Sequence, residues 1–391
     1  LYVHIPFCRR KCLYCDFFSG GASAADWNSF RRALLAELRA RKDELPHLIS
    51  TIYIGGGTPS LMPLDEFTAL CDGIACIAAD ALPDGLSGVE EFTLEVNPED
   101  VSFGSASAWR NLGVNRISMG VQSLVDCELK AVGRSHSAEL ALTSAAILRE
   151  VFDNLNLDIM FGLPGQTLES LDYTLNGMLS LAPDHISAYS LMYEEGTALT
   201  AMAGQGRITP LADETCLEMY SRISSRLARE GFGHYEISNY ARDGYRAVHN
   251  SSYWDFAPYL GLGPSAHSYD GLSIRRSNPS RLREYISRFL PSDGNISSGQ
   301  APFYIEERLS QKERLEEYVM LRLRVREGID LDEFSERFGL FATGNLQRGV
   351  DSILSSSPGV LSICDNRIAL SEEAVMRADD VILRLALALD D

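Results

Sequence analysis

The sequence predicts an α/β fold for most of the chain and a smaller α+β domain at its C-terminal end. Up to about position 240, short apolar runs rich in β-branched residues alternate with longer segments of helical period. This alternation indicates parallel strands joined by crossover helices, arranged either as a doubly wound sheet or as a barrel. From about Phe303 the pattern changes, and helical segments are followed by an expected hairpin.

The predicted strands of the first part are short and apolar, and the predicted helices between them are amphipathic. The strands are 2–5, 51–54, 92–96, 116–120, 155–160 and 185–189, and the clearest helices are 27–41, 64–78, 138–151 and 168–180. Six such units are fewer than the eight of a closed barrel.

In the C-terminal part, helices are predicted over 312–326, 331–338, 348–354 and 374–389, with a turn and helix cap at 328–331. Segments 360–363 and 367–370 are expected to pair about Asp365 and Asn366. This order resembles a winged-helix-like module. Because it lacks the basic surface that DNA binding requires, we interpret it as a lid or partner-docking domain. The linker is predicted at 291–300.

Composition restricts the classes of partner. The chain has 391 residues, with 35 basic and 54 acidic side chains and a net charge of −19. This balance disfavours nucleic acid and anionic lipid as partners. The sequence shows none of the runs of about 20 apolar residues that a membrane-spanning helix needs. Unpaired cysteines fit a reducing compartment, so we expect a cytoplasmic protein without an integral membrane segment.

Three cysteines near the N-terminus, Cys8, Cys12 and Cys15, have the spacing C-x-x-x-C-x-x-C. Iron–sulfur clusters are usually held by four thiolates, so three would leave one iron of a cubane cluster with an open position. A structural zinc site is the weaker alternative, because it requires four ligands, commonly as two separated pairs. A disulfide framework is weaker still in a chain of this length with eight cysteines.

Other polar motifs fall at the carboxyl ends of the predicted strands, where barrel active sites lie. The triplet Gly55-Gly56-Gly57 follows the second strand, Glu95 lies in the third, Gln122 follows the fourth and Asp158 lies in the fifth. A glycine triplet alone is more often a turn than a site, but at a strand end its backbone could lie close against a ligand. A buried Glu95 would need a donor as partner.

With these motifs, which include Gly-Gly-Gly-Thr-Pro at 55–59 and Glu-Val-Asn-Pro at 95–98, the chain resembles the radical S-adenosylmethionine superfamily along nearly its whole length. The branch is that of oxygen-independent coproporphyrinogen III oxidases and their haem-chaperone relatives. The resemblance implies a partial (β/α)6 TIM-like barrel with a [4Fe-4S] cluster on the three cysteines. It implies three regions, a barrel over 1–240, an extension with linker over 241–302 and the winged-helix-like domain over 303–391.

The resemblance also implies which residues bind S-adenosylmethionine. Gly56, Gly57 and Thr58 would meet the methionine amino group, Glu95 and Asp158 the ribose, and the remaining contacts would come from Tyr2, Gln122 and Arg134. Met160 and Tyr189 would line the pocket. For Arg134, an ion pair on a helix surface remains an equal alternative.

A second motif, H-N-x-x-Y-W at 249–254, followed by a glycine-rich segment ending in Ala266-His267-Ser268, resembles the haem-chaperone branch known as HemW. His249 is then the candidate axial haem ligand, and His267 is the reserve. Tyr253 and Trp254 could flank the macrocycle. The alternative is that His249 satisfies a buried polar group and Trp254 fills the core.

The sequence thus predicts a haem chaperone that binds the cluster, S-adenosylmethionine and haem, and delivers haem to acceptor proteins, including respiratory ones. The alternative is an oxygen-independent coproporphyrinogen III oxidase, which oxidatively decarboxylates porphyrinogen propionates. The resemblance favours the chaperone, because Phe17 stands where the oxidases carry an additional cysteine. No catalytic residue is assigned.

Overall fold

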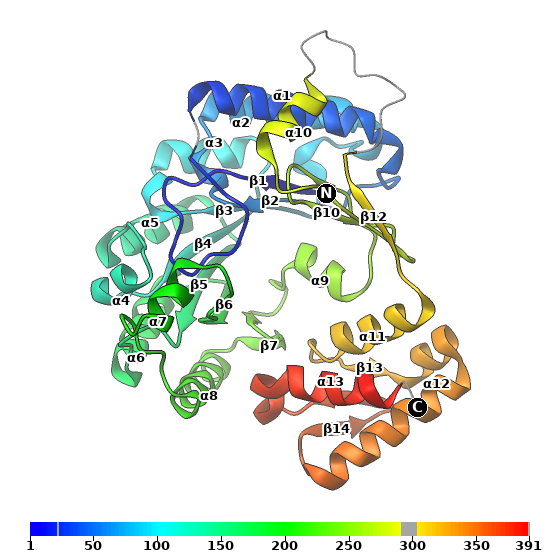
Figure 1. Cartoon of the computed structure of the whole chain (residues 1–391). Coiled ribbons are helices and arrows are strands. Elements are labelled where there is room, and N and C mark those ends of the chain that lie inside the picture. The colour runs from blue at the N-terminus through cyan, green and yellow to red at the C-terminus, as the bar shows by residue number, and fades with distance from the viewer. Residues whose placement is uncertain (22, 291–302, 390–391) are drawn as a thin grey trace.

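The computed structural model describes residues 1–21, 23–290 and 303–389. Its centre is a nine-stranded, mostly parallel sheet, with strands in the order β7-β8-β6-β5-β4-β3-β2-β1-β9 (Figure 1). The six parallel strands of its middle are β1 (Tyr2–Ile5), β2 (Thr51–Gly56), β3 (Glu91–Val96), β4 (Arg116–Gln122), β5 (Leu155–Phe161) and β6 (His185–Ser190).

The strand order decides between the two predicted arrangements. Strands β1 to β6 neighbour one another in chain order, without the reversal that defines a doubly wound sheet. The predicted α/β fold is confirmed, and the sheet is the partial barrel. The predicted strand limits agree with the observed ones within two residues. The main difference is at β2, which includes Gly55 and Gly56, so these glycines end the strand rather than follow it.

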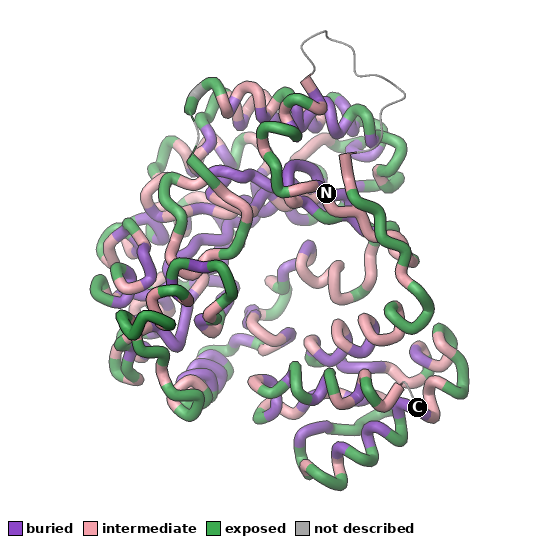
Figure 2. The backbone as a smooth tube through the Cα atoms, viewed as in Figure 1, coloured by how far each residue is buried: buried purple, intermediate pink, exposed green. Residues whose placement is uncertain are grey.

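Helices cover the outer face of this sheet, and the buried residues concentrate between the two layers (Figures 1 and 2). They are α1 (Ala24–Ala40), α2 (Leu64–Ile77), α3 (Phe103–Asn111), α5 (Ala138–Val151), α6 (Leu168–Leu179) and α8 (Asp213–Arg229). Two short helices, α4 (Asp126–Ala131) and α7 (Ala198–Gly204), contribute no residue to this core, and Leu199 of α7 packs instead in a separate apolar cluster with Met160. Capping boxes at Ser23, Ser102 and Thr167 fix the starts of α1, α3 and α6. The sequence analysis did not name α3, α4, α7 or α8, of which the first three are short.

Short elements extend both edges of the sheet. Strands β7 (Gly233–Glu236) and β8 (Asn239–Ala241) add antiparallel to β6, and β9 (Gly261–Leu262) adds parallel to β1. Between these edges lies α9 (Val248–Trp254), which carries the H-N-x-x-Y-W motif. Strands β10 (His267–Tyr269), β11 (Ile274–Ser277) and β12 (Ile305–Arg308) form a second sheet, next to α10 (Leu282–Phe289). The linker predicted at 291–300 lies outside the described residues.

The C-terminal part has its own apolar core. It contains α11 (Gln311–Arg322), β13 (Ile329–Asp330), α12 (Leu331–Ser356), β14 (Leu361–Cys364), β15 (Arg367–Leu370) and α13 (Ala378–Ala388). The predicted hairpin is confirmed, since β14 pairs with β15 and both turn residues, Asp365 and Asn366, have positive φ. Two predicted helices are joined in α12 across a kink at Gly339, and β13 adds a third strand that was not predicted.

The C-terminal part docks on the exposed edge of the barrel sheet. The amide of Ile237 donates to the carbonyl of Arg324 over 3.0 Å, and the amide of Arg326 donates to the carbonyl of Tyr235 over 3.0 Å. Such pairing covers a strand edge that would otherwise be open to other chains. The Glu372 carboxylate accepts hydrogen bonds from Nδ1 of His234 and from Arg326, and so strengthens this contact.

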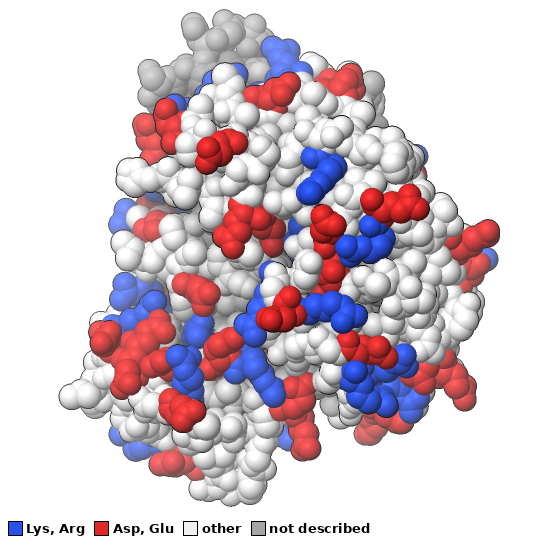
Figure 3. Space-filling view, turned by 180° about the vertical axis from the view of Figure 1, so that it is seen from behind, with Lys and Arg blue, Asp and Glu red and all other residues white. Residues whose placement is uncertain are grey.

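Acidic and basic side chains are intermixed over the face shown in Figure 3, rather than gathered by sign. Among the described helices, none has the length and apolar character needed to cross a membrane.

Candidate functional site

Alternate residues of the parallel strands point into the barrel, and these residues are polar. Neighbouring strands place Glu95 beside Ser118, and Gly120 beside Asp158. The loop with the three cysteines follows β1 and lies at the carboxyl ends of these strands, because the Thr58 hydroxyl just after β2 donates to Sγ of Cys8 over 3.4 Å. The barrel interior and the cysteine loop therefore form one site.

A chain of hydrogen bonds connects two of the cysteines through residues that follow β2, β3 and α4. Thr58 Oγ1, next to Cys8, accepts from Nδ2 of Asn97 over 3.2 Å. Oδ1 of Asn97 accepts from Nη2 of Arg134 over 2.9 Å, and Nη1 of Arg134 donates to Sγ of Cys12 over 3.6 Å. These contacts fix the positions of the two sulfur atoms, as partners of metal-ligating side chains commonly do.

Arg134 thus lies beside the cysteines, and its Nη2 also donates to the backbone carbonyl of Gly120 over 2.7 Å. Arg134 therefore does not form the helix-surface ion pair that the sequence analysis gave as the alternative to a cofactor contact. Asn97 was not among the predicted site residues. Its signal was present in the sequence, because it stands two residues after Glu95 at the end of a strand.

The third cysteine, Cys15, is half-buried like the other two, and burial raises the pKa of its thiol to about 11. Within the described ranges, no three or more His, Cys, Asp or Glu side chains gather closely enough to hold a single metal ion. The ligands of a cubane cluster need not converge on one atom, because each thiolate binds a different iron atom. Three thiols on one loop, two of them hydrogen-bonded at sulfur, fit such a cluster.

The glycines at the end of β2 are required by contacts within the protein. A Cβ on Gly57 would lie 2.6 Å from the carbonyl oxygen of Phe7, and Gly56 has φ 106° with the His4 ring 2.6 Å from its Cβ position. A Cβ on Gly55 would lie 2.9 Å from the Glu95 carboxyl group. The absence of side chains lets β2 approach β1 and β3 closely; direct contact with a ligand stays a prediction.

Two carboxylates face the barrel interior. Glu95 accepts from the Tyr53 hydroxyl over 2.7 Å and from the amide of Gly56 over 3.0 Å. The pKa of Glu95 is raised to about 7, chiefly by burial. The hydrogen bond from Tyr53 lowers this pKa, and the nearby Asp158 carboxyl raises it. Burial likewise raises the pKa of Asp158 to about 6, although Nδ2 of Asn156 donates to it over 2.7 Å. Ionised carboxylates here could accept hydrogen bonds from ligand hydroxyls.

Gln122 and Tyr2 complete the set of predicted cofactor residues. Gln122 stands at a bulge of β4 with φ 67°, and its buried Oε1 has no hydrogen-bond partner among the described residues. A buried acceptor of this kind normally has a donor, so it fits a ligand in the barrel. Tyr2 lies on β1, three strands away from Gln122 in the sheet. Its hydroxyl is 3.0 Å from Nδ1 of His4 on the same strand.

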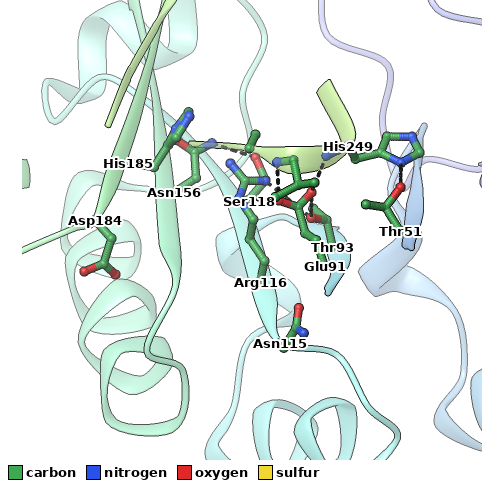
Figure 4. Close-up of polar contacts among 12 residues, drawn as sticks. Thr51, Glu91, Thr93, Asn115, Arg116, Ser118, Asn156, Asp184, His185 and His249 are labelled. Carbon is green, nitrogen blue, oxygen red and sulfur yellow. Dashed lines mark hydrogen bonds and ion pairs between the residues drawn. The ribbon is translucent and has the colours of Figure 1, made fainter. Parts of the chain in front are cut away.

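His249 lies at the other end of the strands, next to their first residues (Figure 4). Its Nδ1 is 2.8 Å from the Thr51 hydroxyl, and its Nε2 is 2.8 Å from the Tyr253 hydroxyl. The side chain is 1% exposed, and burial lowers its pKa to about 2. In this conformation both ring nitrogens lie within hydrogen-bond distance of a hydroxyl group. This is what we expect if His249 is a buried structural histidine, the alternative to a haem ligand. Its role as haem ligand stays a prediction that requires one bond to break. His267, the reserve ligand, is exposed.

Comparisons with known proteins agree with this architecture. The family model described as "Radical SAM superfamily" matches residues 2–176, and the model described as "HemN C-terminal domain" matches residues 309–377.

The chain is 35% identical to the protein named heme chaperone HemW of Bacillus subtilis, with 86% of each chain covered. It is 31% identical to the heme chaperone HemW of Mycobacterium tuberculosis, over 98% of this chain and 94% of that protein. Its fold is similar to that of coproporphyrinogen III oxidase (HemN) from Escherichia coli, described as a radical SAM enzyme. The TM-score is 0.80 at 21% identity, and the match covers 98% of this chain and 89% of the other.

The raised pKa of Glu95 predicts a pH-dependent stability. Between the ordinary pKa of 4.5 and about 7 the folded chain binds a proton at Glu95 that the unfolded chain has released, so stability falls as pH rises through this interval. We expect Glu95→Gln to reduce the fall in the free energy of unfolding between pH 4.5 and 7 by about 1–2 kcal/mol. Urea denaturation of the cofactor-free protein at several pH values between 4.5 and 8 measures it. The exposed Glu90→Gln is the matched control, and an unchanged pH dependence in Glu95→Gln would contradict the assignment.

Proposed function

The chain belongs to the HemW haem-chaperone family of the radical S-adenosylmethionine superfamily, and from this premise we propose that it binds a [4Fe-4S] cluster, S-adenosylmethionine and haem, and delivers the haem to an acceptor protein. We propose that it works in the reducing cytoplasm, where its eight free cysteines would stay reduced. Respiratory haem proteins are the proposed acceptors.

The observation that carries the proposal is the hydrogen-bonded chain from Cys8 through Thr58, Asn97 and Arg134 to Cys12. It brings Thr58, Asn97 and Arg134, from three separate segments, to the loop that carries the proposed cluster ligands Cys8, Cys12 and Cys15. When bound, the cluster supplies one-electron redox chemistry and an iron with an open position. The Thr58 hydroxyl and the Arg134 guanidinium would stabilise the thiolates and orient them.

The polar barrel interior supports the proposed S-adenosylmethionine site. We propose that Glu95 and Asp158 accept hydrogen bonds from the two ribose hydroxyls; in support, Oε1 of Gln122 beside them is an acceptor without a partner in the described chain. The backbone at Gly56 and Gly57 with the Thr58 hydroxyl would meet the amino group at the cysteine side. Tyr2 would close the interior from β1.

The proposal of haem binding is supported mainly by membership of the HemW family. Helix α9 carries the H-N-x-x-Y-W motif, with His249 as the proposed ligand, and Nε2 of this imidazole becomes available if the Tyr253 hydroxyl turns away. Coproporphyrinogen oxidation remains the alternative, since the same cysteines and barrel residues would serve it. Phe17, in place of an additional cysteine, argues against it.

The two functions are separated by supplying both substrates to the anaerobically reconstituted protein. We expect haem to bind at about one equivalent and to transfer to an apo haem protein. Coproporphyrinogen, with reductant and S-adenosylmethionine, should give no catalytic turnover, as measured by fluorescence of the oxidised product. Protoporphyrinogen formation over many turnovers would instead establish the oxidase function.

The cluster assignment predicts the effect of removing one ligand. Cys12→Ala should abolish the broad iron–sulfur absorption after reconstitution, because two thiolates cannot retain the cubane cluster. The exposed Cys76→Ala is the matched control and should keep the full iron and sulfide content. Iron and sulfide analysis that gives equal contents for both variants would refute the assignment.

The haem ligand is tested by three variants. His249→Gln should change the absorption spectrum of bound haem and weaken its affinity at least about tenfold, whereas His267→Ala should change neither. Tyr253→Phe should tighten haem binding, because it frees Nε2 of His249. A spectrum that changes only in His267→Ala would move the ligand to that residue. Circular dichroism of each variant checks that the fold is retained.

A further inference from the structure

A buried chain of hydrogen bonds begins at Asp158 in the barrel interior and ends at the edge of the sheet. Oδ1 of Asp158 accepts from Nδ2 of Asn156 over 2.7 Å. Oδ1 of Asn156 lies 2.6 Å from Nδ1 of His185, and Nε2 of His185 lies 2.7 Å from the Tyr235 hydroxyl. The oxygen of this hydroxyl accepts from the amide of Ala247 over 3.3 Å. Asn156, His185 and Tyr235 are each at most 2% exposed.

The carboxylate at one end fixes the direction of the first two bonds. An ionised Asp158 only accepts hydrogen bonds, so the NH2 group of Asn156 must face it. The carbonyl oxygen of Asn156 then faces His185, and Nδ1 of His185 must carry the proton (Figure 4). In the opposite assignment, the Asn156 carbonyl would face the carboxylate at 2.7 Å without a proton between the two oxygens.

The neutral state of His185 fixes the direction of the remaining bonds. Burial lowers the pKa of His185 well below its ordinary value, and the Arg116 charge lowers it further. A neutral imidazole with its proton on Nδ1 has an acceptor at Nε2, so the Tyr235 hydroxyl donates to it. Every group of the chain therefore donates toward Asp158.

The amide of Asn156 is held on all sides. Its Nδ2 also donates to the Ser118 hydroxyl over 2.8 Å, and this hydroxyl donates to Oδ1 of Asp158 over 3.4 Å. Its Oδ1 accepts from the Ser187 hydroxyl over 3.2 Å as well as from His185. Because both N–H groups and both lone pairs are used, the amide cannot turn without breaking several buried hydrogen bonds.

The far end of the chain lies where the C-terminal part docks. Tyr235 belongs to β7, and its backbone carbonyl accepts from the amide of Arg326 over 3.0 Å. The guanidinium of Arg246 lies 5.3 Å from the centre of the Tyr235 ring. These contacts hold the Tyr235 hydroxyl from outside the barrel, and the chain transmits its position to the Asp158 side chain.

We propose that His185 and Tyr235 are positioning residues of the cofactor site, which hold the Asp158 carboxylate through Asn156 in the orientation that binds the ribose of S-adenosylmethionine. The ribose contact rests on the proposed function, whereas the directed chain is a property of the protein alone. Neither residue would touch the cofactor, because Asn156 lies between them and Asp158. A binding side chain of this kind requires such support to keep a fixed orientation.

The direction of the chain is tested by NMR of the cluster-loaded protein labelled with nitrogen-15 at its seven histidines, where His185→Asn identifies the signals of His185. We expect a neutral His185 with its proton on Nδ1 at neutral pH. Tyr235→Phe should shift the Nε2 signal downfield, because it removes the hydrogen bond to this nitrogen. Tyr240→Phe, on the neighbouring strand β8, is the matched control and should leave the signal unchanged. A proton on Nε2, or no shift in Tyr235→Phe, overturns the proposal.

The positioning role is tested by a matched pair of variants at one site. His185→Asn keeps an N–H donor near the place of Nδ1, whereas His185→Leu has a similar size and no donor. We expect the affinity for S-adenosylmethionine, measured by anaerobic calorimetry, to stay within about twofold in His185→Asn and to fall about tenfold in His185→Leu. Tyr235→Phe should weaken binding about threefold. Circular dichroism checks that each variant is folded.

The outcomes separate this proposal from the proposed function. Equal losses of affinity in His185→Asn and His185→Leu would show that His185 only fills space, and an unchanged affinity in His185→Leu and Tyr235→Phe would show that the chain does not support the site. Either result overturns the positioning role. If the protein without substitutions binds no S-adenosylmethionine, the proposed function fails and the ribose contact with it, while the histidine spectra still decide whether the directed chain exists.

Discussion

The position of α9 depends on one buried carboxylate. Glu91 is 2% exposed, and it accepts hydrogen bonds from the amides of Val248 at 2.7 Å and His249 at 3.2 Å, and from the Thr93 hydroxyl. Its charge lies 3.9 Å from the equally buried Arg116 guanidinium (Figure 4). An unpaired charge would be strongly unfavourable here, so β3, β4 and α9 keep their places together. The H-N-x-x-Y-W motif is held through this contact.

The strands of the barrel and the position of its polar residues could be predicted from the sequence. In each parallel strand the outward residues are apolar and pack under the helices, while the inward residues are polar. The alternation of short runs rich in β-branched residues with helical segments predicted the strands within two residues. Because parallel strands end at one edge, it also predicted that Glu95, Gln122 and Asp158 would share a site, and the structure brings them together.

The contacts of the individual side chains could not be predicted in the same way, because they join distant segments. His249 meets Thr51 across 198 positions, and the glycine triplet after Ile54 is constrained by His4, Phe7 and Glu95 from other segments. No local pattern contains such information. Asn97 shows the intermediate case. Its place in the chain marked it as a strand-end residue, but only the fold shows that it bridges Thr58 and Arg134.

The two proposed binding sites are joined through one aromatic side chain. The Tyr53 hydroxyl donates to Glu95, the proposed ribose contact, and the Tyr53 ring stacks on His249 with 5.1 Å between ring centres. A ligand that draws Glu95 into its own hydrogen bonds competes with Tyr53, and any movement of Tyr53 changes the packing of His249. Such a contiguous contact is the physical requirement for coupling between sites. In this architecture, the proposed cofactor site in the barrel and the proposed haem ligand on α9 therefore share a contact residue, although they lie at opposite ends of the strands.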